Sequence, residues 1–184
     1  IKRYLKQLEQ HHKETYEHSL RVASICRNLG EVNSLVQLDI TLLYNSGLLH
    51  DIGKLKVSTK ILSKAGNLTE SERRMIDGHV RKGFLILEGN FFEEIREVIV
   101  GHHEFSRKPY PRNGKDRRDK SRELERRYDC NNFSMLGQIL AVSDIYDALS
   151  MARAYKPALS RSDVETQFRE DFTGDSKYIN QVLR

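Results

Sequence analysis

Apolar residues recur at helical spacing along almost the whole chain, and this periodicity limits the fold more than any other feature. Leu35, Leu38 and Leu42 lie along one helical stripe, and Ile95 and Ile99 belong to another. No segment shows the regular alternation of apolar and polar residues that is typical of a strand exposed on one face. The sequence therefore predicts an all-α fold.

Capping residues and glycines indicate where the expected helices begin and end. The first helix is expected to run to Leu29 with Gly30 as its stop, and Asn33 or Ser34 is expected to cap the second. A Thr-Glu-Ser-Glu capping box opens a third helix at Thr69. The later helices are expected at residues 69–83, 92–103 and 133–150, with one or two short helices after residue 162.

Length and composition predict one globular domain that covers residues 1–184. A chain of this length buries about 70% of the surface that its unfolded form exposes. It has no apolar stretch of about 20 residues that could span a membrane, and no signal-peptide pattern, so we expect a cytoplasmic protein. Because Ile1 stands in place of an initiating Met and already lies in a helical pattern, we expect a piece of a longer protein.

A charged insertion is expected at residues 112–132. Between Arg112 and Cys130, eight Lys or Arg residues stand among five Asp or Glu residues, and the net charge of the whole chain is +5. Mixed signs and few aromatic residues favour a solvated surface over a nucleic-acid patch, so duplex nucleic acid is not an expected partner. Cys26 and Cys130 are expected to be reduced thiols, since two distant cysteines match no paired-cysteine metal pattern.

Histidines and acids repeatedly occupy helix faces that are otherwise apolar. Burying such groups without partners is costly, so their repetition indicates a shared partner. Glu14 and His18, for example, are four residues apart and therefore lie on one helical face. The residues with this placing are Glu14, His18, His50, Asp51, His79, His102, His103 and Asp144. Inward-pointing side chains from several helices are a typical way to build a metal site in a helical bundle.

The chemistry of these donors narrows the choice of metal. Imidazole and carboxylate without thiolate suit iron, manganese or another divalent ion that prefers nitrogen and oxygen ligands, rather than structural zinc. Two such ions bridged by a carboxylate favour in-line displacement at phosphorus. We therefore expect a binuclear site with Fe or Mn.

Several motifs resemble those of a known family. The segment HDIGK at residues 50–54 resembles the His-Asp-x-x-Lys signature of HD-domain phosphohydrolases. The segments HHE at 102–104, DIYDAL at 144–149 and RAYK at 153–156 are similar to the HD-GYP group of that superfamily. This resemblance implies an HD-domain helical bundle with a metal site in its core. It also implies hydrolysis of cyclic di-GMP.

The resemblance implies a role for each matching residue. Its metal ligands would be His18, His50, Asp51, His79, His102, His103 and Asp144, with Asp51 as the bridging ligand. In some members a glutamate at the position of Glu14 supports a third ion, so two or three divalent ions are implied. Lys54 would act beside Asp51 in catalysis and contact the substrate phosphate. Further substrate-binding residues would be Tyr110, Asp147, Arg153 and Lys156.

The loop after HHE departs from the HD-GYP pattern. The group usually has Asp-Gly-x-Gly-Tyr-Pro there, whereas this chain has a loop one residue shorter in which Pro109 precedes Tyr110. Proline restricts φ and lacks an N–H donor, so the family's loop shape does not carry over. Metal binding is therefore better supported than the identity of the substrate.

The resulting hypothesis is a metal-dependent cyclic di-GMP phosphodiesterase that produces pGpG and could cut it further to GMP. One alternative is an HD phosphohydrolase that acts on another nucleotide. Another is a regulatory module that binds a nucleotide or a protein without useful turnover. Besides a cyclic dinucleotide substrate, the expected partners are an upstream sensor domain and diguanylate cyclase (GGDEF) proteins.

Overall fold

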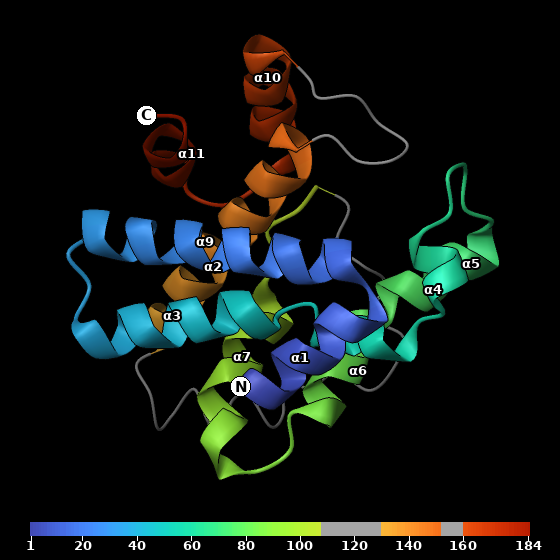
Figure 1. Ribbon diagram of the computed structural model, residues 1–184. Helices are drawn as coiled ribbons and strands as arrows, with labels where there is room; N and C mark the ends of the chain where they lie inside the picture. Colours follow the sequence, from blue (N-terminus) through green and yellow to red (C-terminus); the bar gives the residue numbers. More distant parts are fainter. Residues whose placement is uncertain (108–129, 152–159) are drawn as a thin grey trace.

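The computed structural model describes residues 1–107, 130–151 and 160–184, and these are mostly helical (Figure 1). The helices are α1 (Lys2–His11), α2 (Lys13–Val32), α3 (Gln37–Leu49), η1 (Ile52–Lys56), α4 (Thr59–Leu62), α5 (Glu70–Asp77), α6 (His79–Ile86), η2 (Asn90–Phe92), α7 (Glu93–Gly101), α9 (Cys130–Ser150), α10 (Arg161–Asp171) and α11 (Ser176–Val182). Within the described ranges, extended pairing is limited to a bridge between Ser106 and Phe172. The prediction of an all-α fold is confirmed.

Four helices enclose the apolar core. Helix α2 packs against α3 and α9, and α7 packs against the same two helices. In Figure 1, α2 and α3 lie side by side, and α9 crosses them. Val22, Leu43, Ile99 and Leu140, one from each helix, are fully buried. Burying such a side chain contributes about 2 kcal/mol, so contacts between helices hold the bundle together.

The first predicted helix is two helices, divided at His12. The backbone of His12 is extended, with φ −155° and ψ 100°, and its Nδ1 accepts a hydrogen bond from Thr15 N at 3.2 Å. The imidazole thus caps α2 by satisfying an N–H that has no helical acceptor in the first turn. The break lets α1 turn and pack against both α2 and η1.

The prediction that Gly30 ends the first helix is wrong, because α2 continues to Val32. Helix α3 approaches so closely at this point that a Cβ on Gly30 would lie 3.1 Å from Ile40 Cγ1. The glycine therefore allows two helices to come together, and its weak helical propensity is outweighed by their packing.

The prediction of a cap at Asn33 or Ser34 is also wrong. Helix α3 follows Val36 and has no side-chain cap. The amide of Asn33 instead donates to Leu29 O at 2.7 Å and to Gln181 Oε1 at 2.9 Å. Asn33 thus helps to terminate α2 and attaches α11 to it.

The capping box at Thr69 is confirmed. Glu72 N donates to Thr69 Oγ1 at 3.3 Å, and Thr69 N donates to Glu72 Oε2 at 2.7 Å. The helix that it opens is shorter than predicted, since α5 ends at Asp77 and α6 begins at His79, after Gly78. The expected helix over residues 69–83 is therefore two short helices.

The remaining boundaries lie close to those predicted. Helix α7 ends at Gly101, directly before the paired histidines, and α9 begins at Cys130 and ends at Ser150. Helices α10 and α11 confirm the two short helices at the end. Most of the expected insertion, residues 112–129, lies outside the described residues. Among the described helices, none is both long and apolar enough to cross a lipid bilayer.

The segment after His50 packs backbone to backbone on α6. A Cβ added to Gly53 would lie 1.8 Å from His79 O and 2.6 Å from Gly83 N. Glycine alone permits so close an approach between η1 and α6. This contact brings Asp51, which precedes η1, next to His79 at the start of α6.

Gly53→Ala is expected to push η1 away from α6 and to lower the free energy of unfolding by about 3 kcal/mol, because the added methyl group meets backbone atoms that cannot rotate away. Urea unfolding of the metal-free protein, followed by circular dichroism, measures the change. Gly66→Ala is the matched control, since no atom lies within 4 Å of the Cβ that it would add. Equal stabilities of the two variants would contradict the close contact.

Candidate metal centre

Histidines and aspartates from five helical elements meet in one largely buried cluster. Their donor atoms form three groups, and within each group they lie within 4.8 Å of one another. The groups are His79, His102 and His103; His18, His50 and Asp51; and His50, His102 and Asp144. His50 and His102 each belong to two groups, so the three form one continuous cluster. The structure thus brings together seven of the eight ligands that the sequence indicated.

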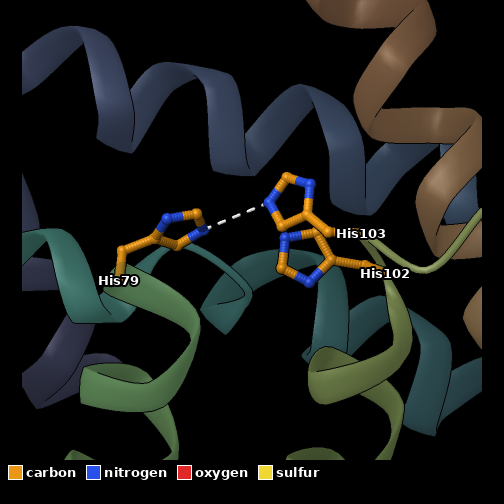
Figure 2. A group of neighbouring side chains, drawn as sticks. All are labelled: His79, His102 and His103. Carbon is orange, nitrogen blue, oxygen red and sulfur yellow. Dashed lines mark hydrogen bonds between the residues drawn. The ribbon is translucent and has the colours of Figure 1, made fainter. Parts of the chain in front are cut away.

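Three imidazoles form one end of this cluster. Figure 2 shows His79, at the start of α6, facing His102 and His103, which follow the end of α7. His79 Nε2 lies 3.4 Å from His103 Nε2. Inward-facing imidazoles this close together are typical of a metal site with nitrogen ligands.

Asp51 lies between the histidine groups and turns one carboxylate oxygen toward each. Its Oδ1 is 3.3 Å from His79 Nε2. Its Oδ2 is 3.6 Å from His50 Nε2 and 3.8 Å from His18 Nε2. Lys54 Nζ donates to the same Oδ2 at 2.6 Å. The carboxylate of Asp51 thus lies within reach of donors from both groups.

Three of these histidines are oriented by the backbone three residues earlier in the chain. Each pairs its Nδ1 with a carbonyl oxygen in the last turn of a helix, where the helix ends before it can supply the usual N–H four residues later. The pairs are His50 with Gly47 at 2.8 Å, His79 with Ile76 at 2.8 Å, and His102 with Ile99. A carbonyl only accepts hydrogen bonds, so Nδ1 carries the proton and Nε2 is left for a metal.

The free nitrogens fit a metal ion. Among the described residues, His50 Nε2 and His102 Nε2 are buried and form no hydrogen bond. Leaving such an atom without a partner costs about 1–3 kcal/mol. A divalent ion with nitrogen and oxygen ligands would satisfy both atoms.

The ionisation of most cluster residues also suits metal binding. Burial lowers the pKa of His79 to about 3 and that of His103 to about 4, and it holds the pKa of His102 well below its usual range. Burial would raise the pKa of Asp51, but the ammonium of Lys54 and nearby imidazoles outweigh it and hold that pKa well below its usual range. Metals bind neutral imidazoles and ionised carboxylates, so these groups require no change of protonation.

His18 differs from the other histidines because carboxylates contact both of its nitrogens. Nδ1 lies 2.6 Å from Asp147 Oδ2, and Nε2 lies 3.0 Å from Asp144 Oδ1. Burial opposes its protonation, but hydrogen bonds to these carboxylates prevail and raise the pKa of His18 to about 9. In the metal-free protein at neutral pH, His18 is therefore an imidazolium.

Arg21 contacts the site although sequence reasoning did not single it out. Its guanidinium donates to both oxygens of Asp147, at 2.7 Å from Nε and 3.0 Å from Nη2. The available signal was its place three residues after His18, which puts both side chains on one face of α2.

The other predicted site residues are placed as follows. Glu14 lies in the first turn of α2 with an exposed side chain, and its role as a ligand stays a prediction. Asp147 is buried against His18, and its role toward substrate likewise stays a prediction. Tyr110, Arg153 and Lys156 lie outside the described residues.

Asp51→Ala is expected to weaken metal binding by more than about 100-fold, because loss of a direct ligand should exceed the 10- to 100-fold effect of losing an outer partner. Lys54→Ala is the control, since it removes the cation beside Asp51 and leaves all the donors in place. Elemental analysis after dialysis against a chelator measures the metal retained. Equal metal loss in both variants would contradict the prediction that Asp51 is a direct metal ligand.

Metal binding is expected to release about one proton from His18 at pH 8, because the metal displaces the proton of a group whose pKa is about 9. Affinity should accordingly rise with pH until His18 is neutral. Calorimetric titration in buffers of different ionisation enthalpy counts the protons. His18→Gln should release about one proton fewer, and an unchanged count would show that His18 is already neutral.

Curated relatives of this chain occur among bacterial phosphodiesterases. The 3'3'-cGAMP-specific phosphodiesterase 2 of Vibrio cholerae is 29% identical over 153 residues, which cover 81% of this chain and 27% of that protein. The cyclic di-GMP phosphodiesterase of Thermotoga maritima is 30% identical over 161 residues, which cover 85% of this chain and 39% of that protein. The chain thus spans less than half the length of either relative.

Solved structures and a family model agree on the fold. The HD domain of the L. monocytogenes phosphodiesterase PgpH matches with a TM-score of 0.61 and 16% identity, covering 98% of this chain and 93% of that one. Its complex with cyclic-di-AMP matches with a TM-score of 0.62 and 17% identity, covering 98% and 91%. The family model described as HD domain matches residues 15–149, which include all the clustered histidines and aspartates. The chain belongs to the HD domain family.

Proposed function

We propose that this chain is a metal-dependent phosphodiesterase domain that cleaves a cyclic dinucleotide. The observation that carries the proposal is the position of Asp51, which is buried between two groups of imidazoles with one oxygen toward each. A bridging carboxylate with nitrogen donors on both sides suits two ions placed for in-line displacement at phosphorus.

The proposed metals are two divalent ions, Fe or Mn, because the donors are nitrogen and oxygen atoms without thiolate. When bound, such ions supply positive charge to a phosphoryl oxygen and lower the pKa of water. A third ion beside Glu14 belongs to the proposal as well. It is supported by the position of Glu14 one turn before His18 on α2.

Lys54 is proposed to contact the substrate phosphate. Its side chain is 20% exposed, whereas that of Asp51 is 3% exposed, so Lys54 lies between Asp51 and the solvent from which a substrate would approach. In the metal-free site its ammonium balances the charge of Asp51. Cations bound to Asp51 would take over that role, and Lys54 could then form a charge-assisted bond with a phosphate oxygen.

The first-choice substrate is cyclic di-GMP, opened to pGpG, which the domain could cut further to GMP. The similarity to the Thermotoga maritima enzyme, named as a cyclic di-GMP phosphodiesterase, supports this choice. A second candidate is 3'3'-cGAMP, since relatives of comparable identity in Vibrio cholerae are named as specific for it. Tyr110, Arg153 and Lys156 remain the proposed contacts that distinguish among these substrates.

An activity panel tests the proposal. The chain, reconstituted without oxygen with Fe or Mn, should hydrolyse cyclic di-GMP or 3'3'-cGAMP to linear products that chromatography separates. Asp51→Ala should remove this activity, while Lys54→Ala should retain metal and lower kcat. If the chain cleaved only a different nucleotide, the assignment as a phosphohydrolase would stand, but a cyclic dinucleotide as its substrate would be refuted. Tight binding without cleavage would favour the regulatory module.

A further inference from the structure

The orientation of His18 depends on side chains from elsewhere in the fold. His50, His79 and His102 use carbonyls at helix ends, but His18 lies inside α2. The carbonyl three residues before it, Thr15 O, already accepts a hydrogen bond from Ser19 Oγ at 3.0 Å. Helix-interior carbonyls are also occupied by backbone N–H groups. Nδ1 of His18 therefore has its partner on another helix.

That partner is Asp147 of α9, which is itself held in place. Asp147 Oδ2 lies 2.6 Å from His18 Nδ1, and Asp147 is 4% exposed. Arg21 donates Nε to Oδ1 at 2.7 Å and Nη2 to Oδ2 at 3.0 Å. A guanidinium that donates to both oxygens fixes the plane of the carboxylate as well as its position.

We propose that Arg21 is a positioning residue of the metal centre, which acts through Asp147 to turn Nε2 of His18 toward the metal. The inference rests on the proposed function, because it presumes that His18 is a ligand. It assigns the pair of Asp147 and Arg21 to the support of His18, which belongs to a different donor group from His79 and His103. Both oxygens of Asp147 are already engaged by protein groups.

Two simpler roles for Arg21 make different predictions. If Arg21 acted on the metal only through its charge, its removal would strengthen cation binding, because like charges repel. If it served only to join α2 to α9, its removal would lower stability and leave the affinity of the folded protein unchanged. A positioning role predicts weaker metal binding in a protein that remains folded.

The test is the Mn²⁺ affinity of the whole chain, measured by competition with a chelator. Arg21→Ala should weaken binding by about 10- to 100-fold, the usual effect of removing an outer partner of a histidine ligand. The Mn²⁺ affinity of Arg21→Lys should lie between those of Arg21→Ala and the wild type, because an ammonium keeps the charge but lacks the paired donors. Arg169→Ala is the matched control, since Arg169 is 44% exposed against 38% for Arg21 and also holds a carboxylate, that of Glu165.

A double-mutant cycle tests whether the effect passes through His18. Once His18→Ala has removed the ligand, adding Arg21→Ala should change the affinity by less than about threefold. Thermal unfolding of the metal-free variants shows which of them are folded. If Arg21→Ala does not fold, the metal affinity of Arg21→Lys provides the test. Unchanged or tighter binding, an equal loss in Arg169→Ala, or full additivity with His18→Ala would overturn the inference. Absence of Mn²⁺ binding by the wild type would instead refute the metal centre itself.

Discussion

The buried carboxylate of Asp51 is the constraint on which the site depends. An ionised carboxylate inside a protein is stable only when cations and hydrogen bonds replace its lost hydration. Lys54 provides one cation, and the nearby imidazoles provide nitrogen donors for metal ions that would supply others. The backbone contact between Gly53 and His79 places η1 so that all of these groups converge. The packing of η1 on α6 is thus a requirement of the chemistry as well as of the fold.

Carbonyl groups at helix ends orient three of the imidazoles. A helix leaves its last carbonyls without partners, and three histidines use them to set both tautomer and direction. The break at Gly78 makes this arrangement possible for His79, because it leaves the carbonyl of Ile76 at the end of α5. An interruption that shortens a helix therefore serves the site. His18 lies inside a helix, and its Nδ1 pairs instead with the carboxylate of Asp147 on another helix.

Sequence reasoning was most accurate where a signal is local. Helical periodicity indicated the helices, and the reciprocal hydrogen bonds between Thr69 and Glu72 followed from their spacing. It failed where tertiary packing outweighed a local preference, as at Gly30, which lies within α2 at a close approach to Ile40 of α3. It also missed Arg21, whose partner Asp147 is 126 residues away. Its spacing from His18 placed both side chains on one face of α2, but nothing within α2 indicated Asp147 as its partner.

The sequence by itself determined an all-α chain with an ordered set of imidazoles and carboxylates, because periodicity and donor chemistry are properties of residues and their spacing. Only the tertiary structure decided which of these groups contact one another. It placed Asp51 between two groups of histidines and joined Asp147 to both His18 and Arg21. These relations depend on distances of a few Å between helices that are far apart in sequence, and such distances arise from packing rather than from local preference.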